Sequence, residues 1–334
     1  MSIGNAKKIA VVGDGSWATA IVKILLNNVE QLNWYIRLKE DLDYIKQRHH
    51  NPRFLSSVEL DIDKLNLYNS IEETVTDADI IVFVIPSAYV LAATENCKNN
   101  VFKNKFIVSA VKGIIPEIHE TTCDFLHNKF NVPMSNLGVV SGPCHAEEVA
   151  LERLSYLTLS AENVEDANYL AKLFSCKYIK TKSSDDIFGT EYSAILKNIM
   201  AVASGIAHGL GYGDNFQSVL ISNAIREMKR FVDEVHPITR DIKNSAYLGD
   251  LLVTAYSQFS RNRTFGNMIG KGYSVKSAQL EMNMVAEGYY AVKGIYEINK
   301  KYNVEMPITD AVYRILYEKI SAVMEFRLLS DIMD

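Results

Sequence analysis

The sequence predicts a doubly wound α/β sheet in its first half and an all-helical region in its second half. Short β-branched runs alternate with helical patterns up to about residue 184, and strands that alternate with helices form parallel sheets. Beyond that point strand-like runs become scarce and helical spacing continues to the last residues. We therefore expect one domain at residues 1–186 and a second at residues 187–334.

Length and composition agree with two ordinary globular domains. The 334 residues are 48% hydrophobic and 22% charged, and a typical domain has about 150 residues. The net charge of −5 gives no general electrostatic case for binding nucleic acid or an acidic membrane. The four cysteines contain no C-x-x-C pair, and we find neither a secretory leader nor an apolar run near the roughly 20 residues of a membrane span. A reduced, cytoplasmic protein is expected.

A glycine turn follows the first predicted strand, Ile9–Val12. Gly13 and Gly15 have no Cβ and permit a tight turn, and apolar residues at helical spacing follow from Trp17 onward. The start of a helix offers unpaired N–H groups and a positive dipole end, which suit a pyrophosphate. With Ala18 as the third small residue, the pattern G-x-G-x-x-A is typical of dinucleotide binding. A β–α turn that merely needs glycine would have the same pattern.

The residue after the second predicted strand, at residues 32–36, bears on the choice of cofactor. An acid there favours NAD, whereas an arginine can hold the 2′-phosphate of NADP. Arg37 stands at this position and favours NADP, while Glu40 and Asp41 lie close enough in the chain to leave NAD open. An arginine at a solvated strand end is an equally ordinary interpretation.

Further strands are expected along the first half, bounded by polar or glycine-containing segments. Two late strands on either side of a helix are candidates for antiparallel pairing. The predicted strands lie at residues 79–85, 106–111, 137–140, 156–160 and 178–180, with a shorter one near residue 67, and the late helix lies at Val164–Phe174.

Two of these strand ends carry groups suited to an anion, and ligand sites of doubly wound sheets lie at the carboxyl ends of strands. Lys112 could reach an anionic substrate, although a single lysine after a strand is more often just solvated. Gly142 and Pro143 predict a sharp turn into a helix, with the proline near the first helical position. We expect His145 to be polar or packed, because H-E-x-x-H is absent from the sequence and no metal site is expected.

In the second half, a helix predicted around residues 191–207 carries Lys197. Small side chains at helical spacing on both sides let a ligand approach this lysine, and a desolvated lysine is suited to proton transfer. On this stretch alone, a lysine that extends past a helix–helix contact toward solvent is the more ordinary interpretation.

Two later segments place charged groups near helix starts. Asp250 follows a glycine at the start of an apolar run and suits an N-cap. The segment SRNRTFG at residues 260–266 has two arginines and several short polar side chains, which suit a phosphate, although solvated basic loops are common. The segment at residues 284–288 is also expected to open a helix, and Pro307 is expected to begin the last long one.

Taken together, these motifs resemble the bacterial-type NAD(P)-dependent glycerol-3-phosphate dehydrogenases over nearly the whole chain. The glycine turn GDGSWATA is generic, whereas the ordered combination of LKN, GDL and SRNRTFG is specific to that family. The resemblance implies a Rossmann domain followed by an all-α domain of the 6-phosphogluconate dehydrogenase C-terminal-like type. It implies reversible reduction of dihydroxyacetone phosphate to sn-glycerol 3-phosphate for phospholipid biosynthesis, with NAD(P) as cofactor. It further implies a homodimer that binds no nucleic acid and does not insert stably into a membrane.

The resemblance also assigns roles to residues. Lys197 would be the general acid/base, and Asp250 or Asn262 would position it or the substrate. Substrate contacts would also come from Lys112, Gly142, Cys144, Ser260, Arg261 and Asn262. Dinucleotide contacts would come from Gly13, Gly15, Ser16, Trp17, Arg37, Lys112, Ala146, Arg261, Val285 and Glu287.

Three residues depart from the family pattern: Ala18 and Cys144 replace a usual glycine and a usual serine or threonine, and His145 stands where phenylalanine is common. None of them is the presumed proton-transfer group. Two alternatives stay open, namely a β-hydroxyacid dehydrogenase that acts on a carboxylate substrate and a catalytically silent dinucleotide sensor. The phosphate-suited arginine segment argues against the first. Lys197, Asp250 and the Arg261–Asn262 pair argue against the second, because a sensor needs only the first domain.

Overall fold

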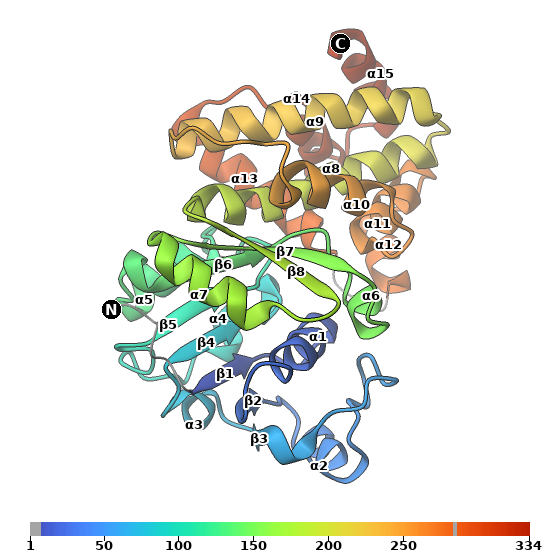
Figure 1. The fold of residues 1–334 in the computed structure, drawn as a ribbon. Coiled ribbons are helices and arrows are strands. Elements are labelled where there is room, and N and C mark those ends of the chain that lie inside the picture. Colours follow the sequence, from blue (N-terminus) through green and yellow to red (C-terminus); the bar gives the residue numbers. More distant parts are fainter. Residues whose placement is uncertain (1–7, 283–285) are drawn as a thin grey trace. The chain divides into compact units, whose positions relative to one another are not determined.

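The computed structural model describes residues 8–282 and 286–334 (Figure 1). Contacts within the chain define two compact units. A sheet unit comprises residues 8–111 and 122–190, and a helical unit comprises residues 112–121 together with the described residues from 191 to 334. The short segment 112–121 therefore leaves the sheet unit after β5 and belongs to the helical unit.

The sheet unit contains one eight-stranded sheet in the order β3-β2-β1-β4-β5-β6-β7-β8. The first six strands of that order are parallel, which confirms the predicted doubly wound sheet. Strand β7 is antiparallel to β6 as expected, but β8 is parallel to β7, because helix α7 forms a crossover between them. The strands are β1 Ile9–Val12, β2 Leu32–Tyr35, β3 Leu65–Tyr68, β4 Ile80–Phe83, β5 Phe106–Ser109, β6 Leu137–Ser141, β7 Ser155–Ala161 and β8 Ile179–Ser184.

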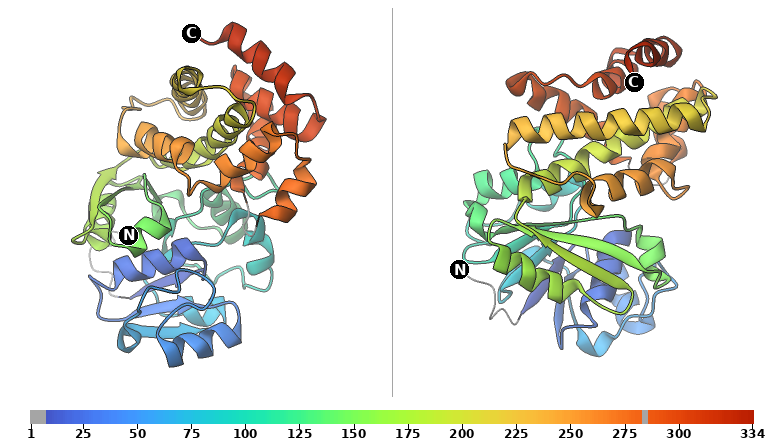
Figure 2. Two further views of the ribbon diagram at one scale, coloured as in Figure 1. Left: turned by 90° about the vertical axis from the view of Figure 1, so that its right-hand side faces the viewer. Right: turned by 45° about the horizontal axis from the view of Figure 1, so that its top comes forward.

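Helices cover both faces of this sheet (Figures 1 and 2). Side chains alternate across a strand, so Val82 of β4 packs into the same core as α1, whereas Phe83 faces the other way. The Phe83 ring meets Phe102 edge-on at 6.4 Å, and Phe102 meets Phe130 of α5 at 4.9 Å. The helices are α1 Ser16–Leu25, α2 Lys39–Arg48, α3 Ile71–Val75, α4 Val90–Ala93, α5 Thr122–Phe130, α6 Ala146–Ala150 and α7 Val164–Phe174, with short 3-10 turns at Ile62–Lys64, Ser87–Tyr89 and Met134–Asn136.

The described part of the helical unit has no named strand, which confirms the all-helical prediction for the second half. Its core is built around α8, whose residues 191–207 are all buried. The helices are α8 Ile187–Gly209, α9 Asp214–Val235, α10 Asp250–Tyr256, α11 Arg261–Gly270, α12 Val275–Glu281, α13 Glu287–Tyr302, α14 Pro307–Tyr313 and α15 Ala322–Ile332, with π-helical turns at Ser245–Gly249 and Arg314–Glu318.

Three local predictions are wrong. Pro143 is not at the start of a helix, because α6 begins at Ala146 and the proline lies in the preceding turn. Asp250 is the first residue of α10 and not its N-cap, since a π-helical turn runs directly into that helix. The helix from Pro307 is not a single long one, because Lys319 has a left-handed φ of 61° that separates it from α15.

Candidate active site

The turn between β1 and α1 is shaped by two glycines. Gly13 has a φ of 138°, which side chains disfavour, and an added Cβ would lie only 2.4 Å from the carbonyl oxygen of Val84. At Gly15, the N-cap of α1, no described atom lies within 4 Å of the place a Cβ would take. No side chain caps α1, and the first N–H groups of a helix have no partner within the helix itself. The turn therefore fits the pyrophosphate of a dinucleotide.

Side chains from later segments hold this turn in place. The indole Nε1 of Trp34 donates to the carbonyl oxygen of Gly13 at 2.7 Å, and the amide of Asn51 donates to the carbonyl oxygen of Asp14 at 2.9 Å. The Asp14 carboxylate in turn accepts from the backbone N–H of Arg37 at 3.0 Å. Sequence reasoning missed Trp34 and Asn51, because nothing in their own segments shows which backbone groups they meet.

The remaining predicted cofactor contacts of this region lie on the same elements. Ser16 and Trp17 open α1, and Arg37 is exposed just beyond β2. The guanidinium of Arg37 makes no hydrogen bond or ion pair with any residue that the structure describes.

The two acids that left NAD open are engaged elsewhere. Arg53 binds Glu40 at 2.7 Å and Asp41 at 2.6 Å, and Asp41 is buried. Glu40 and Asp41 are thus both paired with Arg53, whereas Arg37 is exposed beyond the end of β2.

The turn after β6 forms a second glycine-dependent segment of the sheet unit. Gly142 has a φ of 139°, and a Cβ there would lie 2.4 Å from the carbonyl oxygen of Tyr156. The buried Cys144 directs its thiol to that same carbonyl, with a donor–acceptor distance of 3.2 Å. The thiol thus has a hydrogen bond of its own in place of the hydroxyl that the family usually carries. Ala146 follows as the first residue of α6, which packs against α1.

In the helical unit, Lys197 and Asp250 form a buried ion pair. Lys197 Nζ lies 2.5 Å from Asp250 Oδ1, and the two side chains are only 5% and 1% exposed. Thr254 donates to the carbonyl oxygen of Asp250 at 2.7 Å and lies 3.5 Å from the same Oδ1. Both charges are out of water, and the ion pair offsets part of the cost of burying them. The ordinary interpretation of Lys197 as a lysine reaching solvent is therefore wrong.

The next residue along α8 links this pair to the segment 112–121. Asn198 Nδ2 donates to the carbonyl oxygen of Lys112 at 2.6 Å, and Lys112 itself is half-buried. A Cβ on Gly288 of α13 would lie 2.6 Å from the carbonyl oxygen of Asn198, so α13 also passes close to this point. Asn198 belongs to the LKN motif, but sequence reasoning assigned it no role.

The arginine segment begins a helix and is not a loop. Ser260 caps α11 by accepting from the backbone N–H of Arg263 at 3.3 Å, and Arg261 is exposed in the first turn. The side chain of Asn262 is buried, and its Oδ1 accepts from the N–H of Gly288 at 2.9 Å. Glu287, the first residue of α13, is thereby held near α11. Val285 lies outside the described residues.

Glycines allow α11 to lie directly on α8. A Cβ on Gly266 of α11 would be 2.1 Å from the carbonyl oxygen of Val202, and one on Gly205 of α8 would be 2.1 Å from that of Arg263. The helix that carries Arg261 and Asn262 is thus packed against the helix that carries Lys197.

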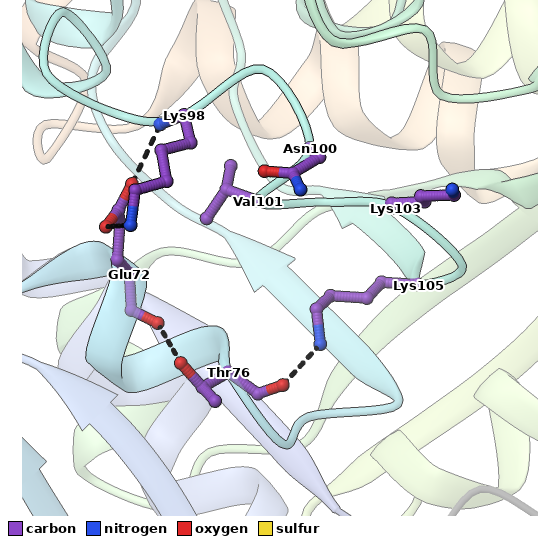
Figure 3. Close-up of a pocket in the computed structure, with 7 residues that line it drawn as sticks. All are labelled: Glu72, Thr76, Lys98, Asn100, Val101, Lys103 and Lys105. Atoms are coloured by element: carbon purple, nitrogen blue, oxygen red, sulfur yellow. Dashed lines mark hydrogen bonds and ion pairs between the residues drawn. The ribbon is translucent and has the colours of Figure 1, made fainter.

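A cavity in the described part of the chain lies away from these residues. It has a volume of about 300 Å³ and lies beside α3, near the amino ends of β4 and β5 (Figure 3). Its charges are largely paired: Glu72 and Lys98 form an ion pair of 3.5 Å, and Lys105 donates to the carbonyl oxygen of Thr76 at 3.0 Å. It contains none of the predicted site residues and does not identify the active site. Its lining residues are Glu72, Thr76, Lys98, Asn100, Val101, Lys103 and Lys105.

The parallel sheet and its glycine turn define the fold of a dinucleotide-binding protein, and the helical unit holds a buried lysine–carboxylate pair that is a candidate for proton transfer. Residues 8–167 match the family model described as the N-terminus of NAD-dependent glycerol-3-phosphate dehydrogenase, and residues 186–325 match the corresponding C-terminus. The chain belongs to this family of oxidoreductases, as its motifs predicted. Within residues 8–282 and 286–334, no helix combines the length and the apolar character needed to cross a membrane.

Individual relatives are similar to this chain over nearly its full length. The chain is 34% identical over 313 residues to the glycerol-3-phosphate dehydrogenase (NAD(P)+) of Streptococcus agalactiae, which covers 93% of this chain and 92% of the relative. It is 32% identical over 324 residues to the enzyme of the same name from Staphylococcus carnosus, covering 96% and 97%. The crystal structure of glycerol-3-phosphate dehydrogenase from Coxiella burnetii has a TM-score of 0.88 at 27% identity and covers 97% of this chain and 98% of that one.

Proposed function

We propose that this chain catalyses the reversible NAD(P)H-dependent reduction of dihydroxyacetone phosphate to sn-glycerol 3-phosphate, supplying phospholipid biosynthesis in the cytoplasm. The observation that carries the proposal is the buried Lys197–Asp250 pair, with an Nζ–Oδ1 distance of 2.5 Å, in a family of this name. The domain of residues 1–186 would bind the cofactor, and that of residues 187–334 would bind the substrate. The enzyme would act as a homodimer.

The chain's own part in cofactor binding is to hold the dinucleotide at the glycine turn. Gly13 and Gly15 let the backbone approach the pyrophosphate, and the first N–H groups of α1 bind it. The bound nicotinamide supplies the hydride. Arg37 supports a preference for NADP, because its guanidinium suits a 2′-phosphate while Arg53 engages the neighbouring acids.

The proton would come from Lys197. Its Nζ donates to the carbonyl oxygen of the substrate during reduction and takes the proton back during oxidation. Asp250 orients the ammonium, and Thr254 braces Asp250 through hydrogen bonds to its backbone and side-chain oxygens. The low exposure of the pair excludes water from this proton transfer.

The substrate phosphate would be bound by two cationic side chains of the helical unit. Arg261 stands in the first turn of α11, where its guanidinium can bind phosphate oxygens in a forked manner. Lys112 supplies a second cation on a segment that Asn198 holds. Asn262 uses its Oδ1 to bind Gly288, which leaves its Nδ2 as a donor toward the substrate. Binding energy from the phosphate aligns the carbonyl with Lys197.

The test is oxidation of NADH and NADPH by the purified protein with dihydroxyacetone phosphate, followed at 340 nm. Rapid loss of reduced cofactor is expected. A panel of 2-keto and 3-keto carboxylates is run in parallel. Turnover of these substrates in place of dihydroxyacetone phosphate would favour a β-hydroxyacid dehydrogenase. Cofactor binding without turnover on any of these substrates would contradict the proposal and favour the sensor.

A further inference from the structure

The carboxylate that pairs with Lys197 follows a π-helical turn and not an ordinary helix start. In an α-helix the N–H of Asp250 would donate to the carbonyl oxygen of Ala246, four residues earlier. Here it donates to the carbonyl oxygen of Ser245, five residues earlier, and to that of Tyr247. Single π-helical turns are frequent at functional sites. The usual helical donor for the Ala246 carbonyl is thus bound elsewhere.

A side chain of α8 donates to this carbonyl. Ser193 Oγ lies 3.3 Å from the carbonyl oxygen of Ala246, and the serine is fully buried. Ser193 comes four residues before Lys197, and Ala246 comes four residues before Asp250. Residues four apart lie on one side of a helix, so the serine–carbonyl bond and the ion pair are successive contacts between the same two segments. The hydroxyl therefore holds the π-helical turn beside the ion pair.

A second buried serine of α8 holds the other end of α10. Ser204 Oγ lies 3.0 Å from the carbonyl oxygen of Ala255 and 2.9 Å from Oε1 of Gln217. This contact is five residues beyond Asp250, in the α-helical part of the segment. Of the two serines, Ser193 is the one that reaches the π-helical turn. The pair of serines separates the effect of the turn from the effect of any buried hydroxyl between these helices.

We infer that Ser193 is a positioning residue for the proton transfer. By binding the Ala246 carbonyl it fixes the π-helical turn, and the turn in its place holds the Asp250 carboxylate beside Lys197. The inference rests on the proposed function, in which Lys197 donates the proton. Thr254 cannot replace this contact, because it lies on the same helix as Asp250 and moves with it. Small displacements of a catalytic group lower the rate steeply, so this contact with α8 matters for turnover.

The first test does not need turnover. The full chain is labelled sparsely with acetic anhydride, and the labelling rate of Lys197 relative to the exposed Lys180 is followed by peptide mass spectrometry. Ser193→Ala should raise the relative rate about three- to tenfold, because the loss of one hydrogen bond lets the pair open more often. Ser204→Ala is the matched control: it removes an equally buried hydroxyl of the same helix and should leave the rate unchanged.

The second test measures the reaction with dihydroxyacetone phosphate. Ser193→Ala should lower kcat about tenfold, less than the roughly hundredfold effect of a 1 Å misplacement. It should also raise the solvent deuterium isotope effect on kcat, because proton transfer from Lys197 then limits the rate more strongly. A smaller folded fraction would lower kcat without changing that isotope effect. Ser193→Cys keeps a side chain of similar size with a weaker donor and should lie between the serine and alanine proteins.

The outcomes separate this inference from the proposed function. Wild-type labelling of Lys197 in Ser193→Ala, or equal acceleration in Ser204→Ala, would overturn the inference. A lower kcat with an unchanged isotope effect would overturn it as well. If the wild-type protein does not reduce dihydroxyacetone phosphate, the proposed function fails, while the labelling rates still decide whether Ser193 holds the pair.

Discussion

The glycine turn after β1 and the Lys197–Asp250 pair are constructed in opposite ways. The turn is made of backbone: its shape depends on the missing Cβ atoms of Gly13 and Gly15 and its donors are N–H groups of α1. The pair is made of two side chains 53 residues apart, carried by different helices and buried together. A backbone site is specified by a few adjacent residues, whereas a side-chain site depends on how the helices pack. The two sites should therefore fail independently and for different reasons.

The largest expected effect is on the side-chain site alone. Lys197→Met removes the proton donor, and we expect turnover with dihydroxyacetone phosphate to fall by about 10² to 10⁴. The variant also leaves Asp250 buried without its cation, which costs about 3–5 kcal/mol of stability.

A control separates chemistry from stability. The double variant Lys197→Met with Asp250→Asn removes the stranded charge, so it should regain thermal stability without regaining turnover. Lys180→Met, on the exposed side of β8, should change neither quantity. Wild-type turnover in Lys197→Met would contradict the assigned role.

The next effect tests whether the side-chain site depends on helix packing. Gly266→Ala puts a Cβ 2.1 Å from the carbonyl oxygen of Val202, so α11 must move away from α8. Overpacking of this kind costs about 1–3 kcal/mol, to be measured by urea unfolding, and should raise the KM for substrate as Arg261 and Asn262 move. Gly213→Ala is the matched control, because nothing lies within 4 Å of its Cβ position and its φ is −84°. Equal stability of the two variants would contradict the close crossing.

The third expected effect is on the pH dependence of stability, and it arises from a buried carboxylate in the helical unit. Glu227 of α9 is buried and accepts from the N–H groups of Ile308 and Thr309 at 2.8 Å and 2.9 Å, which holds the start of α14. Burial raises its pKa to about 7, against hydrogen bonds that lower it, and the nearby Asp310 adds to the rise.

The sign of the pH effect follows from this pKa. The folded protein binds the proton of Glu227 more tightly than the unfolded chain, whose glutamate pKa is about 4.5. The contribution of Glu227 to the free energy of unfolding is therefore fully present below pH 4.5 and is lost as the pH rises through 7. Glu227→Gln should flatten this part of the profile in urea unfolding at pH 5 and pH 8, while Glu234→Gln, exposed on the same helix, should not. An unchanged slope in Glu227→Gln would contradict the assignment.

The smallest expected effect concerns Arg37, the side chain near the glycine turn that we expect to select between NADP and NAD. Arg37→Ala should reduce the NADPH-to-NADH ratio of kcat/KM about tenfold, because a charge-assisted hydrogen bond to the 2′-phosphate is lost. Arg48→Ala, an exposed arginine at the end of α2, should leave the ratio unchanged. If Arg37→Ala leaves it unchanged as well, Arg37 does not select the cofactor.

The difference between a backbone site and a side-chain site also explains which features could be predicted from the sequence. The strands, the glycine turn and the start of α1 were predictable, because each depends on residues next to one another in the chain. The burial of Lys197 was not, since its partner Asp250 lies in another helix, and only the family resemblance connected them. The ion pairs of Arg53 with Glu40 and Asp41 could likewise not be predicted, because they depend on the path of the loop after α2.

The measurement that tests the account most directly is the dissociation constant of reduced cofactor for the wild-type protein, Gly13→Ala and Lys197→Met. It is obtained by titration of nicotinamide fluorescence. Gly13→Ala forces a Cβ to within 2.4 Å of the Val84 carbonyl oxygen, so its dissociation constant should rise about tenfold or more. Lys197→Met should bind cofactor within about twofold of the wild-type protein while losing turnover. Equal losses of affinity in both variants would show that the two sites are not separate and would contradict the account.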